Sequence, residues 1–194
     1  SVGRTNRPLR ILSLPEQHRL SLYLYKHLTP CNLGILLCLY TGIRIGEICA
    51  LKWMDISAEE KITQIRKTMQ RIQCRTTEPP KTTILISSPK SSCFIRSIPI
   101  PDELSCMLIK YRESDESFFL TGKENYFMEP RSLQNRFKAI TAACGISEAN
   151  FHSLRHTFAT RCVELGFDLK SLSEILGHAN VNITLNRYVH PSLE

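Results

Sequence analysis

The chain has 194 residues, of which 42% are hydrophobic and 22% are charged, so it is long enough to bury the core of a globular domain. Its formal net charge of +7 favours an anionic partner, such as the phosphate backbone of a nucleic acid. No stretch approaches the ~18 uncharged apolar residues of a membrane span. The basic, polar start SVGRTNRPLR lacks the apolar segment of a signal peptide. These features argue against a membrane protein and predict a cytosolic one.

The eight cysteines are scattered along the chain and form no CxxC pair. Several lie in apolar runs such as LLCLY and EICAL, where a free thiol packs as a small hydrophobic group. We therefore expect reduced cysteines rather than a disulfide framework.

The N-terminal part of the chain predicts three helices. Residues 1–10 are expected to be a linker into the domain, which then runs over 11–194. SLPEQHRLSLYLYKHL has mostly helical leucine spacing after a Ser-Leu-Pro start, and CNLGILLCLYTG is apolar enough for a buried helix that Gly42 ends. IRIGEICALKW resumes helical spacing.

From about Lys61 the chain becomes β-branched. The short segments KITQIRKTMQRIQ, TTILIS and FIRSIPI are separated by TEPP and SPKSS. They predict a small three-stranded antiparallel sheet.

The second half returns to helices. SDESFFLTGKENYFMEP is expected to be a loop with a short extended piece. Helical spacing and capping signals predict five helices, in the segments PDELSCMLIKY, PRSLQNRFKAITAACG, NFHSLRHTFATRCVELG, DLKSLSEILGH and VNITLNRYVH. The predicted class is mainly α with one small antiparallel sheet.

Polar residues in two of these segments are candidates for a functional site. In TGIRIGEICALKW, Arg44 and Glu47 share a helix face, which is also the spacing of an ordinary surface ion pair. In SSPKSSCFIRSIPIP, Lys90 lies at the expected tip of a hairpin, where most lysines are simply solvated. Lys81 is a second lysine in this region.

The segment FHSLRHTFAT places two histidines and an arginine within a turn and a half. Arg155 offers a planar fork that suits two phosphate oxygens, and His152 can donate a hydrogen bond or move a proton. Two histidines at i and i+4, His152 and His156, are also a metal-binding pattern, with His178 and Cys162 as further ligands. A zinc hydrolase would place a glutamate after the first histidine, whereas Ser153 follows it here.

The last candidates lie in LGHANVNITLNRYVH. His178 follows a glycine that can end a helix, and Tyr188 comes ten residues later in a short helix. A tyrosine at such spacing usually belongs to the core.

Taken in order, these stretches resemble the catalytic domain of the tyrosine recombinases, the phage and transposon integrase family. The matching segments are TGIRIGEICALKW, the lysine of SPKSSCFIRSIPIP, HSLRHTFAT, LGHANVNIT and LNRYVH, which together span residues 41–190. Their order and spacing make the set far more specific than any one segment.

The resemblance implies a role for each matching residue. Tyr188 would attack a DNA phosphodiester to give a 3′-phosphotyrosine, while Arg44 and Arg155 bind its non-bridging oxygens. His178 would contact the phosphate, and His152 would be a proton acceptor or a hydrogen-bond donor. Lys90 would be the acid for the leaving 5′-oxygen, and Glu47 would support the first arginine. His156 has no counterpart in the pattern and is expected to be structural.

The resemblance also implies the partners. We expect double-stranded DNA carrying core recombination sites and further protomers in a tetramer on DNA, with no metal, cofactor or ATP and a bacterial cytoplasmic location. Such integrases usually carry DNA-binding domains before the catalytic part and often a tail after the tyrosine, neither of which we expect in this chain. A type IB topoisomerase and a non-catalytic DNA-binding regulator remain alternatives with the same fold, and a zinc hydrolase is an alternative of another class.

Overall fold

The computed structural model describes residues 9–74, 81–88 and 94–189. Its helices agree closely with those predicted: α1 (Leu14–Lys26), α2 (Pro30–Thr41), α3 (Ile45–Ala50), α4 (Asp102–Lys110), α5 (Pro130–Ala143), α6 (His152–Glu164), α7 (Leu169–Leu176), α8 (Val181–Thr184) and the π-helical turn η3 (Leu185–Val189). The strands are β1 (Ile56–Ser57), β2 (Ile62–Ile65), β3 (Thr68–Cys74), β4 (Lys81–Ser87) and β5 (Arg96–Pro99), and a short 3₁₀ turn, η1 (Trp53–Asp55), precedes β1. The mainly helical class with small antiparallel sheets is therefore confirmed.

The strands pair differently from the expectation. The run from Lys61 to Gln73 was expected as one strand of a single sheet, but it divides into β2 and β3, which belong to different sheets. One sheet has the order β1-β2-β5, with Thr63 opposite both Ile56 and Ile98, and the other pairs β3 with β4 from Thr68↔Ser87 to Cys74↔Lys81. Arg66 and Lys67, two charged residues between β2 and β3, mark the break.

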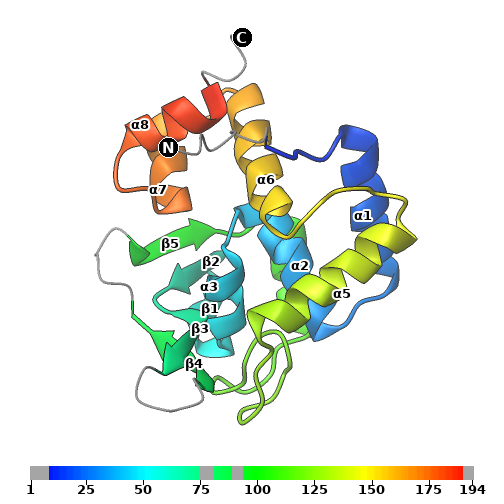
Figure 1. Cartoon of the computed structure of the whole chain (residues 1–194), viewed down its shortest axis with the longest axis vertical. Helices are drawn as coiled ribbons and strands as arrows, with labels where there is room; N and C mark the ends of the chain where they lie inside the picture. Colours follow the sequence, from blue (N-terminus) through cyan, green and yellow to red (C-terminus); the bar gives the residue numbers. More distant parts are fainter. Residues whose placement is uncertain (1–8, 75–80, 89–93, 190–194) are drawn as a thin grey trace.

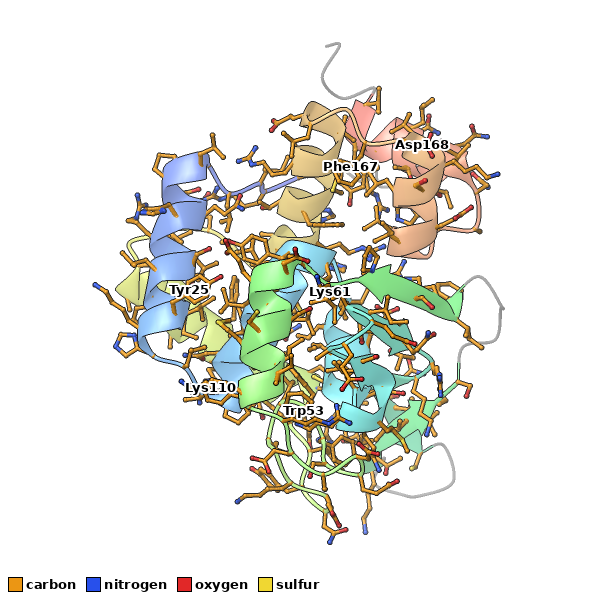
Figure 2. The ribbon with its side chains drawn as sticks, turned by 180° about the vertical axis from the view of Figure 1, so that it is seen from behind. Tyr25, Trp53, Lys61, Lys110, Phe167 and Asp168 are labelled. Atoms are coloured by element: carbon orange, nitrogen blue, oxygen red, sulfur yellow. The ribbon has the colours of Figure 1, made fainter. Side chains whose placement is uncertain are left out.

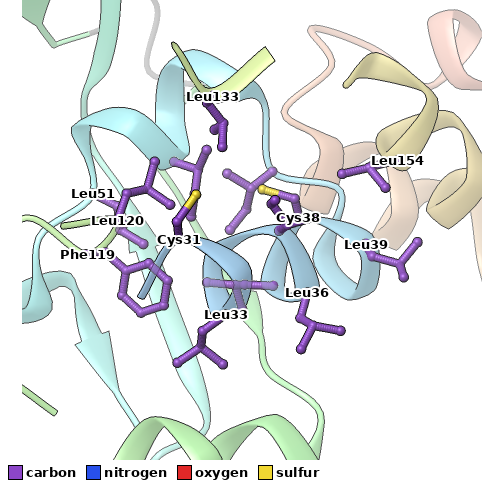
Figure 3. Close-up of a cluster of buried hydrophobic side chains, with 14 of the residues drawn as sticks. Cys31, Leu33, Leu36, Cys38, Leu39, Leu51, Phe119, Leu120, Leu133 and Leu154 are labelled. Atoms are coloured by element: carbon purple, nitrogen blue, oxygen red, sulfur yellow. The ribbon is translucent and has the colours of Figure 1, made fainter. Parts of the chain in front are cut away.

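Helix α2 forms the centre of the core. It is apolar on nearly every side, packs against α1 and α6, and ends at Gly42, whose φ of 70° lies in the left-handed region that glycine adopts freely. Figure 3 shows Leu33, Leu36 and Leu39 of this helix among buried side chains that also include Phe119 and Leu154. Because α2 is buried so completely, it holds the segment that follows it in a fixed position.

The C-terminal helices form a second, smaller cluster against α6. Buried apolar side chains from α6, α7 and η3 pack together there, namely Ala159, Cys162, Leu172, Leu176 and Tyr188. In Figure 1 these helices lie at one end of the molecule, with β5 next to α7. Phe167 and Asp168 mark the α6–α7 loop at that end in Figure 2, far from Trp53. Asp168 caps α7 by accepting a hydrogen bond from the Ser171 N–H at 2.9 Å.

Within the described residues, every helix is too short or too polar to cross a membrane. The seven cysteines of that part of the chain are free thiols, and burial raises the pKa of Cys49 to about 12. A buried thiol of this kind is an inert packing group, as the sequence indicated.

Candidate active site

Arg44 stands at the start of α3, where Glu47 holds it. Its backbone N–H donates to Glu47 Oε2 at 3.0 Å, and its Nη1 donates to Oε1 at 3.3 Å. The three-residue spacing seen in the sequence lets one carboxylate engage both groups. The guanidinium also lies 5.5 Å from the centre of the Phe94 ring, and 27% of the side chain is exposed. Arg44 is thus oriented but still accessible to a ligand.

Arg96 is a part of the site that the sequence reasoning missed. From β5, its Nη1 and Nη2 donate to the two oxygens of Glu47 at 2.8 and 2.9 Å, and its Nε donates to the carbonyl of Ile175 in α7 at 2.6 Å. The signal was available: in FIRSIPI, alternation puts Arg96 on the same inward face as Ile98. A charged residue on a buried strand face needs a carboxylate partner, and Glu47 is that partner.

The Glu47–Arg96 pair is fully inside the protein, with side-chain exposures of 5% and 6%. Burial alone would raise the pKa of Glu47, but the hydrogen bond and charge of Arg96, with help from Arg44, bring it below its ordinary value. The pair therefore joins α3, β5 and α7 through one ionised carboxylate, and this places Arg44.

Changing Glu47 to glutamine should lower the free energy of unfolding by about 3–5 kcal/mol, because it leaves the buried Arg96 charge unpaired. Urea unfolding at pH 7 measures this. The matched control is Glu116→Gln, which breaks the exposed ion pair with Lys52 and should cost no more than about 1 kcal/mol. Equal effects of the two substitutions would contradict the importance given to the buried pair.

Arg155 projects from α6 into the junction between α2 and α7. Its Nη1 donates to the carbonyl of Gly42 at 2.7 Å and its Nη2 to the carbonyl of Leu176 at 2.6 Å, and the residue is 2% exposed. Burial, followed by the nearby charge of Arg44, lowers its pKa to about 9. Two guanidiniums that the sequence separates by more than a hundred residues are therefore neighbours.

His178 lies beside Arg155 at the C-terminal end of α7. Gly177 ends that helix at φ 67°, and an added Cβ there would also come within 3.1 Å of the Arg96 guanidinium. Arg155 Nη2 is 3.3 Å from His178 Nε2, and His178 Nδ1 is 2.7 Å from Thr184 Oγ1. Because a guanidinium only donates, Nε2 accepts and the Nδ1–H donates to the threonine.

Tyr188 is the buried residue of the π-helical turn η3. Its Oη lies 2.9 Å from Nδ1 of His156, and the residue is 5% exposed. Burial raises the pKa of the phenol, although the charges of Arg155 and Arg187 act in the opposite direction. A π-helical turn is rare and often occurs at functional sites, and here it turns the tyrosine toward α6.

The remaining predicted residues are placed less centrally. His152 is exposed at the start of α6, with its ring 5.5 Å from that of His156. Partial removal of its ring from solvent, followed by the charges of Arg155 and Arg44, lowers its pKa. Lys90 falls outside the described residues, in the connection from β4 to β5 rather than between two paired strands. Lys81, the other lysine considered, begins β4 opposite Cys74.

The cluster carries an excess of positive charge. Arg44 and Arg96 both donate to the carboxylate of Glu47, Arg96 to both of its oxygens, and Arg155 lies near enough to be affected by its charge. A hollow of about 340 Å³ opens beside Arg44 and is lined by α3, β3, β4 and Phe94. Three guanidiniums against one carboxylate form a site that an anion would stabilise.

The metal alternative finds no ligand set in the part of the chain that the structure describes. No group of three histidine, cysteine, aspartate or glutamate side chains there is arranged around a common point. The ring nitrogens of His178 are already engaged by Arg155 and Thr184.

The low pKa values of the site histidines predict how stability changes with pH. Burial, with neighbouring positive charges, lowers the pKa of both His156 and His178 from 6.5 to about 4. Between these values the unfolded chain binds protons that the folded chain does not. The thermal midpoint should therefore fall as the pH is lowered from 6.5 to 4, measured by circular dichroism. A double His156→Gln, His178→Gln variant should show a shallower fall, and an unchanged slope would contradict the assignment.

Comparison with known proteins places this arrangement in a family. The model described as the phage integrase family matches residues 9–194. The chain belongs to the phage integrase family. It is 31% identical over 172 residues to "Tyrosine recombinase XerC-like" of Caldanaerobacter subterraneus subsp. tengcongensis, covering 80% of this chain and 44% of that protein. It is 32% identical over 169 residues to "Transposase A from transposon Tn554" of Staphylococcus aureus, covering 81% and 43%.

A solved transposon integrase has the same fold. The Tn1549 transposon integrase, in complex with a circular intermediate DNA, superposes with a TM-score of 0.76 at 24% identity, over 98% of this chain and 64% of that one. The family model confirms the family expected from the sequence, and the superposition confirms the fold. The chain spans less than half the length of the two relatives named above.

Proposed function

We propose that residues 11–194 form the catalytic domain of a site-specific DNA recombinase, an integrase that cleaves and rejoins DNA through a covalent 3′-phosphotyrosine. The observation that carries the proposal is the cluster of Arg44, Arg155 and His178 next to the buried hydroxyl of Tyr188. Phosphoryl transfer needs its developing negative charge stabilised and its nucleophile positioned. This cluster supplies fixed cations and a hydroxyl together, so no metal or cofactor is assigned.

The main roles are those that the resemblance implies, and the placement of the groups supports them. Tyr188 attacks the phosphorus, and the guanidiniums of Arg44 and Arg155 bind its non-bridging oxygens. Glu47 orients Arg44 through the two hydrogen bonds at the start of α3. Because the phosphotyrosine conserves the energy of the phosphodiester, a new 5′-hydroxyl can reseal the strand without ATP.

The other predicted residues complete the reaction. His178 is assigned to a phosphate oxygen, since it already lies within 3.3 Å of Arg155. His152, at the exposed end of α6, is assigned a further hydrogen bond to the phosphate. Lys90 is assigned as the acid for the leaving 5′-oxygen on the resemblance alone.

The partners follow from the same chemistry. Double-stranded DNA with core recombination sites is the substrate, and the bound DNA of the Tn1549 integrase supports this. Exchange of strands requires further protomers, which we infer assemble as a tetramer on DNA. Integration or excision of a mobile element, on the nucleoid in the bacterial cytoplasm, is the proposed role.

Covalent capture on nicked DNA tests the proposal. The substrates are duplexes with a randomised core and a nick near the cleavage point. After cleavage the short fragment next to the nick dissociates, so the strand cannot be resealed and the protein stays attached to it. A denaturation-resistant adduct that forms in excess EDTA is the expected result. Cleavage that leaves no adduct and that EDTA prevents would support the zinc alternative and contradict the proposal.

The same assay separates the alternatives with this fold. Retention of duplexes without any adduct would identify a non-catalytic DNA-binding regulator. Relaxation of supercoiled plasmid, with no transfer of the cleaved strand to a second 5′-hydroxyl, would identify a type IB topoisomerase activity. Transfer to an added 5′-hydroxyl strand is the outcome expected of a recombinase.

A further inference from the structure

The imidazole that contacts the phenol of Tyr188 is His156, the residue for which the sequence pattern offered no role. The distance from its Nδ1 to Tyr188 Oη is 2.9 Å, and the rings lie 5.9 Å apart. His152, which the resemblance made a proton acceptor or a hydrogen-bond donor, lies one turn earlier and is exposed. Among the hydrogen bonds of the described residues, none joins His152 to Tyr188.

The charges of Arg155 and Arg187 act on the phenol of Tyr188 and favour loss of its proton. Nδ1 of His156 lies within hydrogen-bond distance of the phenol oxygen, so it is placed to take that proton. Burial, with the charges of His152, Arg187 and Arg155, lowers the pKa of His156 to about 4, so at neutral pH the ring is uncharged. An uncharged imidazole has one nitrogen free to accept a proton.

We propose that His156 accepts the proton of the Tyr188 phenol during DNA cleavage. The inference rests on the proposed function. As the Oη–P bond forms, the P–O5′ bond breaks and the phenol proton passes to Nδ1. The leaving 5′-oxygen takes a proton from a cationic side chain or from water. In rejoining, the 5′-hydroxyl attacks and returns its proton to the group that had protonated the leaving oxygen. The P–Oη bond breaks, and the His156 imidazolium returns its proton to the tyrosine.

The electrostatics of the site make this transfer depend on bound DNA. The charges that disfavour protonation of His156 include Arg155 and Arg187. A phosphate anion held by Arg155 would offset those charges, so the imidazole becomes a stronger base when the substrate is in place. Without DNA, the tyrosine stays protonated and buried. The same hydrogen bond therefore holds the nucleophile unreactive until a phosphate arrives.

The test uses His156→Asn, whose side-chain amide occupies the place of Nδ1 but does not accept a proton at neutral pH. Adduct formation with Tyr188 should fall by about 10²–10⁴-fold, the usual contribution of a general base, while DNA affinity is unchanged. The matched control is His18→Asn on the exposed face of α1, which should react as the wild type does. Undiminished adduct formation by His156→Asn would overturn the inference.

Two further arms separate proton transfer from structural support. A substrate whose leaving 5′-oxygen is replaced by sulfur needs no acid, so the His156→Asn defect should persist on it. Fluorinated tyrosine at position 188 has a more acidic phenol, for which a weaker base suffices. It should raise the rate of adduct formation by His156→Asn at least about tenfold. A defect that fluorination leaves unchanged would assign His156 a packing role only. A wild-type chain that forms no adduct would overturn the proposed function itself.

Discussion

Replacing Tyr188 by phenylalanine should abolish covalent attachment to DNA while leaving DNA binding intact. The substitution removes only the hydroxyl, which is the proposed nucleophile, and keeps the ring packed among Ala159, Leu172 and Leu176. Loss of the hydrogen bond to His156 should cost about 1 kcal/mol of stability, so the variant remains folded. Binding is measured by gel retardation and attachment by denaturing electrophoresis.

The control for this prediction is Tyr126→Phe. Tyr126 is 62% exposed and lies in the loop before α5, away from the cluster. That variant should form the adduct at the wild-type rate. An adduct that survives Tyr188→Phe would exclude Tyr188 as the nucleophile, whatever the control shows.

Changing Arg155 to alanine should lower the cleavage rate by about 10³-fold, because it removes a preorganised charge from the place where negative charge develops. Binding should weaken much less, since most of the affinity comes from other phosphate contacts. Single-turnover cleavage of the nicked duplex at saturating protein measures the effect on the chemical step.

Loss of Arg155 also removes hydrogen bonds to two backbone carbonyls, so a structural effect needs its own control. Arg161 lies on the same helix, and its Nη2 donates to the carbonyl of Leu12 at 2.7 Å, outside the cluster. Arg161→Ala should lower stability without lowering the cleavage rate of the folded protein. If both variants lost cleavage equally, a general disturbance of α6 would explain the result better.

Much of the fold could be predicted from the local spacing of residues in the sequence. Helical periodicity, together with Gly42 and Gly177 as caps, gave the helices nearly to the residue. The pairing of the strands could not be predicted, because the break between β2 and β3 depends on which partner each strand finds.

The candidate site shows the same division. The Arg44–Glu47 contact is local and could be seen from the three-residue spacing. The contact of Arg155 with the carbonyl of Gly42 joins positions 113 residues apart, so only packing of α6 on α2 creates it. Arg96 was detectable from strand alternation, whereas the contact of His156 with Tyr188 depends on how η3 docks on α6.

We propose above all that the guanidiniums of Arg44 and Arg155 bind one DNA phosphate and neutralise its negative charge. Its most direct test compares cleavage of a normal core site with one whose scissile phosphate is an uncharged methylphosphonate, using wild type and Arg155→Ala. If Arg155 neutralises that charge, the factor by which Arg155→Ala lowers the cleavage rate should be at least about tenfold smaller on the uncharged substrate than on the normal one. An equally large defect on both substrates would show that Arg155 acts elsewhere.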